Sequence, residues 1–373
     1  MMGRAHQRGS AVLLTLGVVV VLTTLGSSLL LRSLNENQLG RRSAARQRAF
    51  FLAEAAADHA ISNLRANERG DIQTTPLLTG TYWAEIAPAG GLRYLITAHG
   101  SSGGEQWDVE VVVQQEGRSL FQLPLLGAES VKLKKNGLTD SYDSRLGPYD
   151  PETAGQRGDV GTNATGEDSI VLQQGSSING QVIVGPGIAD PSEAVSTDGS
   201  VVITGAPPIV SAAQAVDLPP VDTTGLSCDQ DLYLPKEATF TFTESGSPYC
   251  YNEIKAEKDS VIAVSGDVVV YANRVDFDKH LQVNAGGSPT QLILQIASDD
   301  DVDIDKDGSF VGAIYAPRSR VRLKKETDFY GAIAAERVEI DKKSQFHYDE
   351  ALGDSDDGPI GSYEVSVLSW REP

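Results

Sequence analysis

Residues 10–31 read SAVLLTLGVVVVLTTLGSSLLL and contain no charged side chain. As an α-helix, this run of about 22 residues would be about 33 Å long, because each residue adds 1.5 Å along the axis. The hydrocarbon layer of a bilayer is about 30 Å thick. Two arginines, Arg4 and Arg8, and then Gly9 come just before the run. The stretch therefore predicts a membrane-spanning helix close to the N-terminus.

The helical pattern continues beyond the apolar run. Residues 34–67 contain no proline and one glycine, and they are rich in alanine, leucine, arginine and glutamine, which are strong helix formers. Apolar residues then recur at a helical spacing, at Phe50, Ala53, Ala57, Ile61 and Leu64. This spacing is typical of a helix that packs one side onto a domain. We therefore expect one long helix over residues 10–67, with its first part in a membrane and its second part against protein.

Two segments of this region resemble type IV prepilins, and in particular the PilX N-terminal family of minor pilins. They are RGSAVLL at residues 8–14 and AFFLAEAAA at residues 49–57. The resemblance implies that a prepilin peptidase cuts after Gly9, so that residues 1–9 are a leader and Ser10 becomes the N-terminus. It also implies a non-enzymatic subunit of type IV pilus assembly. Its partners would be other minor and major pilins, the inner-membrane assembly platform, the prepilin peptidase and membrane lipid.

One position departs from the pattern of major pilins. Those pilins resemble one another in a glutamate at the fifth mature position, which pairs with the N-terminal ammonium of a neighbouring subunit. An unpaired charge in the apolar filament core would be costly. Here the fifth mature position is Leu14. This favours a role at the filament tip or in initiation over a repeating position in the shaft.

Two other interpretations of the N-terminus stay open. A secretory signal would have an apolar region of about 7 to 15 residues followed by a small-x-small cleavage site, which is shorter than this run. A single-pass anchor that is never cut after Gly9 would instead make the protein a membrane-anchored periplasmic scaffold, bactofilin-like or associated with the cell wall, outside any pilus.

The arginines also bear on orientation. Five of them follow the run, at Arg32, Arg41, Arg42, Arg46 and Arg48, and the positive-inside rule would then place the rest of the chain in the cytoplasm. We nevertheless expect a single-pass protein of the bacterial inner membrane with its bulk in the periplasm, and at the cell surface in a pilus, because the remaining sequence is typical of an extracytoplasmic domain.

The charge is unevenly distributed along the chain. The formal net charge of the 373 residues is -20, yet the first 70 residues carry nine Lys/Arg against four Asp/Glu. The remainder is therefore strongly acidic. Binding to nucleic acid requires a basic surface, so nucleic acid is excluded as a partner. Some three hundred residues beyond the helix are ample for one large or two modest domains.

Residues 68–119 are typical of antiparallel strands. Apolar and polar residues alternate over residues 81–86, 92–97 and 107–113, and glycine-rich turns separate these runs. The pattern predicts a β-meander that buries the apolar side of the helix.

From residue 120 the runs become shorter, and a repeat is present. VDIDKD at 302–307, VRLKKE at 321–326 and VEIDKK at 338–343 alternate with GAIYA at 312–316 and GAIAA at 331–335. Units this short cannot bury an apolar face alone, so they must stack on one another. The sequence thus predicts an α+β fold with a large β-solenoid over residues 120–352. An acidic linker and a C-terminal strand would follow over residues 353–373.

This portion is similar to the large β-helical domain often joined to PilX-type N-termini, and distantly to bactofilin coils. The matching segments are DSYDS at 140–144, GAIYAP at 312–317, FYGAI at 329–333 and HYDEAL at 347–352. That domain has no established activity that the resemblance could carry over to this chain. In the repeat, Ile314 and Ile333 are expected to point inward, and Arg322 and Glu339 outward.

The two cysteines, Cys228 and Cys250, lie on either side of the strand-like TFTFT at residues 239–243. In an oxidising periplasm they would form a disulfide that closes a loop of about 23 residues and stabilises the fold by about 3 kcal/mol. Two free thiols are the alternative.

The sharpest candidate metal site is DDDVDIDKDG at residues 299–308. Asp303, Asp305, Asp307 and Gly308 fit the first half of a calcium loop, although its twelfth position is Ile314 rather than glutamate. An alternative without metal is that Asp303 and Asp305 occupy outward positions of the repeat, on the solvated face of a strand. No other cofactor is indicated.

The sequence contains no recognisable catalytic motif. The five histidines form no motif, and no G-x-S-x-G, H-E-x-x-H or phosphate-binding glycine loop occurs. His347, Asp349 and Glu350 could form an acid-base group, or they could hydrogen-bond exposed backbone at the end of the sheet. We expect that the protein is not an enzyme. The alternative is a polysaccharide-cleaving enzyme on a β-helix, with clustered carboxylates.

Overall fold

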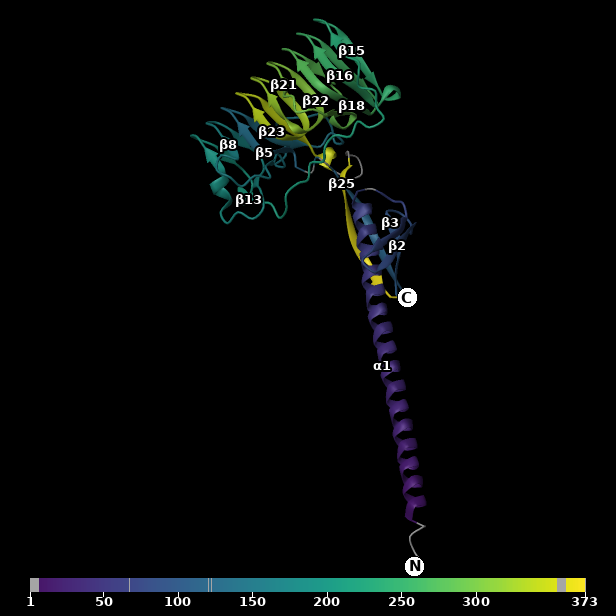
Figure 1. Ribbon diagram of the computed structural model, residues 1–373. Coiled ribbons are helices and arrows are strands. Elements are labelled where there is room, and N and C mark those ends of the chain that lie inside the picture. The colour runs from purple at the N-terminus through teal and green to yellow at the C-terminus, as the bar shows by residue number, and fades with distance from the viewer. Residues whose placement is uncertain (1–6, 67, 120, 122, 354–359, 373) are drawn as a thin grey trace, which may run out of the picture. The chain divides into compact units, whose positions relative to one another are not determined.

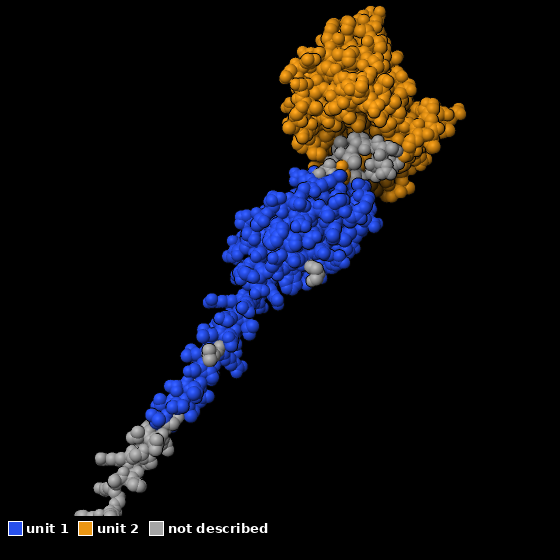
Figure 2. Space-filling model, turned by 90° about the vertical axis from the view of Figure 1, so that its right-hand side faces the viewer, with its two compact units in different colours: residues 1–116, 364–373 blue, residues 117–363 orange. Residues whose placement is uncertain are grey.

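The computed structural model describes residues 7–66, 68–119, 121, 123–353 and 360–372 of the chain (Figure 1). The chain forms two compact units, coloured separately in Figure 2. Unit 1 consists of residues 1–116 and 364–373, and unit 2 of residues 117–363.

Unit 1 combines one long helix with a five-stranded sheet. The sheet order is β1-β2-β3-β4-β25, and β1 to β4 pair antiparallel. The elements are α1 (Gln7–Arg65), β1 (Ile72–Leu77), β2 (Gly80–Pro88), β3 (Arg93–Ser102), β4 (Glu105–Ser119) and β25 (Ile360–Arg371). The strand that the sequence places after the acidic linker is therefore the edge strand next to β4.

The core of unit 1 lies between α1 and one face of this sheet. Ile96 and Ala98 on β3, and Val109 and Val111 on β4, are fully buried, because alternate residues of a strand point to the same face. They pack against the alanine-rich side of α1, which contributes Ala53, Ala56, Ala57, Ala60, Ile61 and Leu64.

Unit 2 contains a single network of 20 paired strands, nearly all of them in parallel register. The strands are β5 (Leu125–Leu133), β6 (Leu138–Tyr142), β7 (Val160–Gly161), β8 (Ile170–Leu172), β9 (Ser177–Ile178), β10 (Val182–Val184), β11 (Val195–Thr197), β12 (Val202–Ile203), β13 (Ile209–Ser211), β14 (Leu232–Leu234), β15 (Thr239–Thr243), β16 (Tyr249–Ala256), β17 (Val261–Ser265), β18 (Val268–Phe277), β19 (Gln282–Val283), β20 (Leu292–Ile296), β21 (Val302–Ile304), β22 (Ser309–Leu323), β23 (Asp328–Ile340) and β24 (Gln345–Asp349). Four short 3₁₀ turns complete it: η1 (Pro191–Ala194), η2 (Glu244–Gly246), η3 (Pro289–Gln291) and η4 (Glu350–Gly353).

The repeat of the sequence sets the register of β21, β22 and β23. Val302 pairs with Val321 and Val321 with Val338, while Ile314 pairs with Ile333. All five side chains are buried. The predicted inward direction of Ile314 and Ile333 is confirmed.

The predicted fold class is wrong. Most of the regular structure consists of strands with one N-terminal helix, and the strands of unit 2 do not wind coil after coil along the sequence as a β-solenoid over residues 120–352 would require. The first strand of the unit, β5, lies in the interior of the network, with β23 on one side and β7 and β8 on the other.

The physical reason lies in the similarity of the repeated segments. Val131 and Leu133 of β5 pair with Val338 and Ile340 of β23, just as the repeat segments pair with one another. A segment with two buried apolar residues and an outward charged residue between them fits any neighbour of the same pattern. The local pattern therefore predicts parallel stacking, but it does not predict the order of the strands.

Candidate functional site

The helix α1 has two chemically different parts. Along its first part the apolar side chains are exposed, among them Leu22, Leu25 and Leu30, which are 53–67% exposed. The described residues of α1 contain a segment long and apolar enough to cross a membrane, with a mean hydropathy of 1.5 and none of its residues buried. From Ala45 onward, one side of the helix is buried in unit 1.

Glycines allow the second part of α1 to lie very close to the sheet. A Cβ atom built on Gly100 of β3 would overlap the carbonyl oxygen of Ala49 and the amide of Ala53, and one on Gly80 of β2 would overlap Leu52. The small residues on both surfaces therefore bring backbone against backbone. At the helix end, the side-chain amide of Gln115 donates a hydrogen bond to the carbonyl oxygen of Leu64 at 2.5 Å.

The predicted cleavage site lies at the start of α1. Gly9 and Ser10 have helical backbone, and residues 1–6 of the predicted leader lie outside the described residues. Cleavage after Gly9 stays a prediction.

Cys228 and Cys250 are joined by a disulfide with a Cα–Cα distance of 4.6 Å. Cys250 belongs to β16, and Cys228 lies in the segment before β14. The bridge therefore ties the irregular segment that follows β13 to the strand network.

The aspartates of the predicted calcium loop face basic residues. Asp303 accepts two hydrogen bonds from Arg322, both at 2.9 Å, and Lys324 lies 3.3 Å from Asp303 and 3.6 Å from Asp305. Asp307 occupies a turn with φ of +55°, a conformation that Glu326 shares at the matching turn of the next repeat. Among the described residues, no group of three or more His, Cys, Asp or Glu side chains is placed to hold a metal ion.

These ion pairs belong to an alternating row of charges across neighbouring strands. In register, Asp303 is followed by Arg322, Glu339 and Lys132. Lys134 of β5 in turn forms ion pairs with Glu339 and Asp341. Arg322 and Glu339 thus lie on the outer face as expected, but both are engaged in pairs and only about a quarter or less of each side chain is exposed.

A buried polar group that the sequence did not predict surrounds His347. Its Nδ1 lies 2.6 Å from Oδ1 of Asp140, and Oδ2 of Asp140 accepts a hydrogen bond of 2.8 Å from the hydroxyl of Tyr149. The His347 ring stacks on Tyr330, at a centroid distance of 4.8 Å, and also contacts the tilted ring of Tyr149, at 3.8 Å. The hydrogen bonds and the stacking together fix the orientation of both tyrosine rings.

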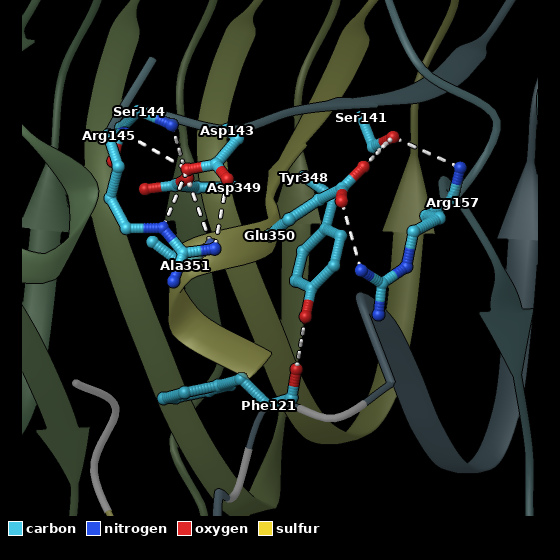
Figure 3. A network of polar contacts seen from close by, with 10 residues as sticks. All are labelled: Phe121, Ser141, Asp143, Ser144, Arg145, Arg157, Tyr348, Asp349, Glu350 and Ala351. Atoms are coloured by element: carbon cyan, nitrogen blue, oxygen red, sulfur yellow. Dashed lines mark hydrogen bonds and ion pairs between the residues drawn. The ribbon is translucent and has the colours of Figure 1, made fainter. Parts of the chain in front are cut away.

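The acid-base group considered from the sequence is not assembled. His347 pairs with Asp140. Asp349, drawn in Figure 3, instead accepts a hydrogen bond from the backbone amide of Ser144 at 2.9 Å. Glu350 instead binds the hydroxyl of Ser141 and the guanidinium of Arg157, at 2.8 and 2.9 Å.

Burial shifts the pKa of several ionisable side chains in this region. Asp349 is fully buried and its Oδ2 has no hydrogen-bond partner among the described residues. Burial raises the pKa of the Asp349 carboxyl, although hydrogen bonds from Ser144 and Ala351 oppose the shift. Burial also raises the pKa of the Tyr142 and Tyr149 hydroxyls, so both stay neutral at physiological pH.

The tyrosines line a cavity of about 630 Å³. Tyr142 comes from the end of β6, Tyr149 from the loop that follows it, and Tyr330 from β23. The signal in the sequence was the three motifs DSYDS, FYGAI and HYDEAL, which the pairing of β6, β24 and β23 brings together.

Comparisons with known proteins identify little of this chain. A family model described as a domain of unknown function, DUF7305, matches residues 246–355, which is well under half of the chain. No curated protein matches the chain.

Among solved structures, the chain is similar to the competence-associated pilin ComZ from Thermus thermophilus. The two are 13% identical, with a TM-score of 0.28, and the match covers 88% of this chain and 97% of that chain. At this TM-score the likeness carries no argument about fold or function.

Proposed function

We propose that this chain is a pilin-like, non-enzymatic subunit of a type IV pilus assembly, of the PilX N-terminal kind, that acts at the filament tip or in initiation. The observation that carries the proposal is the division of α1 into an exposed apolar part and a part buried in unit 1.

The exposed part of α1 requires an apolar environment. Burying apolar surface is favourable by about 25 cal/mol per Å², so a row of leucines and valines in water is strongly unfavourable. A bilayer would cover it before assembly, and the helices of other pilins would cover it in a filament. This gives two classes of partner for the same surface, namely membrane lipid and other minor or major pilins.

Processing and assembly would involve two further partners. A prepilin peptidase would cut after Gly9, and the inner-membrane platform would insert the mature subunit. The absence of a carboxylate at Leu14 and the size of unit 2, residues 117–363, both favour a single or rare position over a repeating one.

The disulfide supports an extracytoplasmic location of unit 2. Disulfides persist in the periplasm and are rare in the cytosol, and Cys228 and Cys250 are bonded. We therefore propose that the chain crosses the inner membrane once, with the sheet of unit 1 and the whole of unit 2 on the periplasmic side, against the count of arginines that follow the apolar run.

The proposal is tested by the N-terminus of the protein made together with a prepilin peptidase. Mass spectrometry of the membrane-extracted chain should find a mature form that begins at Ser10. Gly9→Val should abolish this form, whereas Gly40→Val, at a helix glycine where a Cβ would meet no atom within 4 Å, should leave it unchanged. A chain that keeps residues 1–9 in the presence of active peptidase would favour the uncut anchor and scaffold.

A further inference from the structure

We propose that the tyrosine-lined cavity of unit 2 is a binding site for a neutral oligosaccharide. Three tyrosines, Tyr142, Tyr149 and Tyr330, and three serines, Ser144, Ser288 and Ser309, line the cavity together with small and apolar residues. Its volume of about 630 Å³ lies within the range of about 300 to 1,000 Å³ that is usual for small-molecule sites.

The first argument is the charge of the lining. None of the lining residues carries a charge, and the chain as a whole has a net charge of -20. An anionic ligand such as a phosphate ester would find no cation in the lining and would be repelled by the protein. A cation would find no carboxylate in contact with it. The site therefore suits an uncharged ligand.

The second argument is the combination of rings and hydroxyls. The three tyrosine rings lie edge to face, with centroids 5.6 to 6.4 Å apart, and Ser144, Ser288 and Ser309 add hydroxyls to the lining. Ser144 and Ser288 hydrogen-bond each other, and their remaining hydrogen-bonding capacity would go unused beside a purely apolar ligand, which is unfavourable. A sugar ring offers both an apolar C–H face for an aromatic ring and hydroxyls for hydrogen bonds.

The third argument is that the rings are held in place before a ligand arrives. The His347 ring contacts the rings of Tyr149 and Tyr330, and Asp140 hydrogen-bonds both His347 and the Tyr149 hydroxyl. The hydroxyls of Tyr142 and Tyr330 form no hydrogen bond with any other described residue, so they are free for a ligand. Rigid aromatic side chains lose little entropy on binding, which favours affinity.

The fourth argument concerns the length of the ligand. A second hollow of about 330 Å³ shares Ser144 and Ser288 with the first and is also lined by Thr290, Ala351 and two residues of opposite charge, Arg145 and Asp267, so that its lining too has no net charge. The two hollows therefore adjoin at these serines, whose hydroxyl oxygens are 3.2 Å apart. A chain of linked sugars fits such a continuous track better than a single one.

One segment of the cavity lining is built from small residues. Ala285, Gly286 and Gly287 contribute little side chain, and a Cβ on Gly286 or Gly147 would meet no atom within 4 Å. Gly287 instead packs against the side chain of Asn284, so the open backbone in the lining is that of Gly147 and Gly286, which leave room for a ligand beside them.

The test uses the full-length chain in a zwitterionic detergent, because a detergent with a sugar head group would compete. The probes are maltohexaose, cellohexaose and the hexamer of N-acetylglucosamine, and binding is measured by saturation-transfer NMR and calorimetry. We expect at least one probe to bind with a Kd below about 1 mM. If none of the three binds, the proposal is wrong.

Variants then locate the site. Tyr330→Ala and Tyr142→Ala should each weaken binding at least tenfold, whereas Tyr233→Ala should not change it, because Tyr233 is 56% exposed and lies outside the cavity. Tyr330→Phe keeps the ring and should retain more affinity than Tyr330→Ala, which separates stacking from a general loss of structure. Binding that is unchanged in Tyr142→Ala, Tyr330→Ala and Tyr330→Phe would overturn the proposal, as would binding limited to charged sugars or to peptides.

This inference does not depend on the proposed function. A chain that is never cut after Gly9 could still bind the oligosaccharide, and a processed pilin-like subunit could fail to bind it, so the two experiments fail separately.

Discussion

Ile314 and Ile333 are direct register partners on β22 and β23, and both side chains are fully buried. Each is the third residue of a Gly-Ala-Ile segment, and Gly312 pairs with Gly331 in the same register. A Cβ on Gly331 would overlap the backbone of Gly312. The two repeats therefore pack with backbone against backbone at the glycines and with side chain on side chain at the isoleucines.

The first prediction follows from this packing. Ile333→Ala should destabilise unit 2 by about 2 to 5 kcal/mol, because a cavity replaces the lost side chain. Arg337→Ser is the matched control on the same strand, since its side chain is 50% exposed, and it should cost less than about 0.5 kcal/mol. Hydrogen exchange of the full chain, read at peptides of β22 and β23, measures both. An equal loss of stability in the two variants would mean that the register of β22 and β23 is wrong.

The second prediction concerns the contact between α1 and the sheet of unit 1. Gly100→Ala should destabilise this unit by about 1 to 3 kcal/mol, because the added methyl group overlaps the helix backbone and overpacking costs this much. Gly70→Ala is the control, since a Cβ there meets no atom within 4 Å. Tryptophan fluorescence during unfolding in urea reports on this unit, because Trp83, Trp107 and Trp370 all belong to it. Equal midpoints for the two variants would rule out the close approach.

The third prediction concerns the aspartates of the predicted calcium loop. Burial acts to raise the pKa of Asp303, but the hydrogen bonds and charges of Arg322 and Lys324 outweigh it and lower that pKa. The ion pair therefore contributes stability above the unfolded-chain value of about 3.9, and this contribution is lost as the pH falls. Because these carboxylates already have cationic partners, millimolar Ca²⁺ should not change the unfolding midpoint.

The unfolding midpoint of the Arg322→Gln variant is compared with that of the unaltered chain. The substitution should cost no more than about 1 kcal/mol near neutral pH, since the pair is partly exposed, and it should leave Lys324 as the remaining cationic partner of Asp303. A clear stabilisation of the unaltered chain by Ca²⁺, absent in Asp303→Asn, would instead establish the calcium site.

The fourth prediction concerns Asp349. Its pKa is raised by burial, so the folded protein holds a proton at pH values where the unfolded chain has lost it. The stability contributed by the protonated group is complete below about pH 3.9 and is lost as the pH rises through the raised pKa. Asp349→Asn keeps an oxygen for the amides of Ser144 and Ala351 and removes the charge.

The measurement is the unfolding midpoint of unit 2 as a function of pH. Asp349→Asn should be more stable than the unaltered chain near pH 7, and the difference should shrink toward pH 4. A variant that is less stable at pH 7 and equally stable at pH 4 would show that the ionised carboxylate stabilises the fold.

Whether a feature of the structure could be predicted depends on how far apart in the sequence the residues that form it lie. The helix followed from the spacing of residues within it, and its buried alanine side was visible from Phe50 to Leu64 because that periodicity is local. The parallel register of Val302, Val321 and Val338 was likewise visible, since neighbouring segments repeat one pattern.

The strand order and the tyrosine cavity could not be predicted in this way. Asp140 and His347 are 207 residues apart, and only the pairing of β6 with β24 brings them together. No periodicity specifies that pairing, because many segments of unit 2 carry the same pattern of buried and outward residues. The solenoid prediction is wrong for the same reason.

The central claim is that the exposed part of α1 packs against the helices of other pilin subunits. A photo-crosslinking amino acid at Leu22, which is 61% exposed, tests it in cells that assemble a type IV pilus. The same group at Ala53, which is fully buried in unit 1, is the control. The account predicts that Leu22 crosslinks to pilin subunits in sheared filaments and that Ala53 does not. Crosslinks from Leu22 to lipid alone, with no chain in the filament fraction, would contradict it.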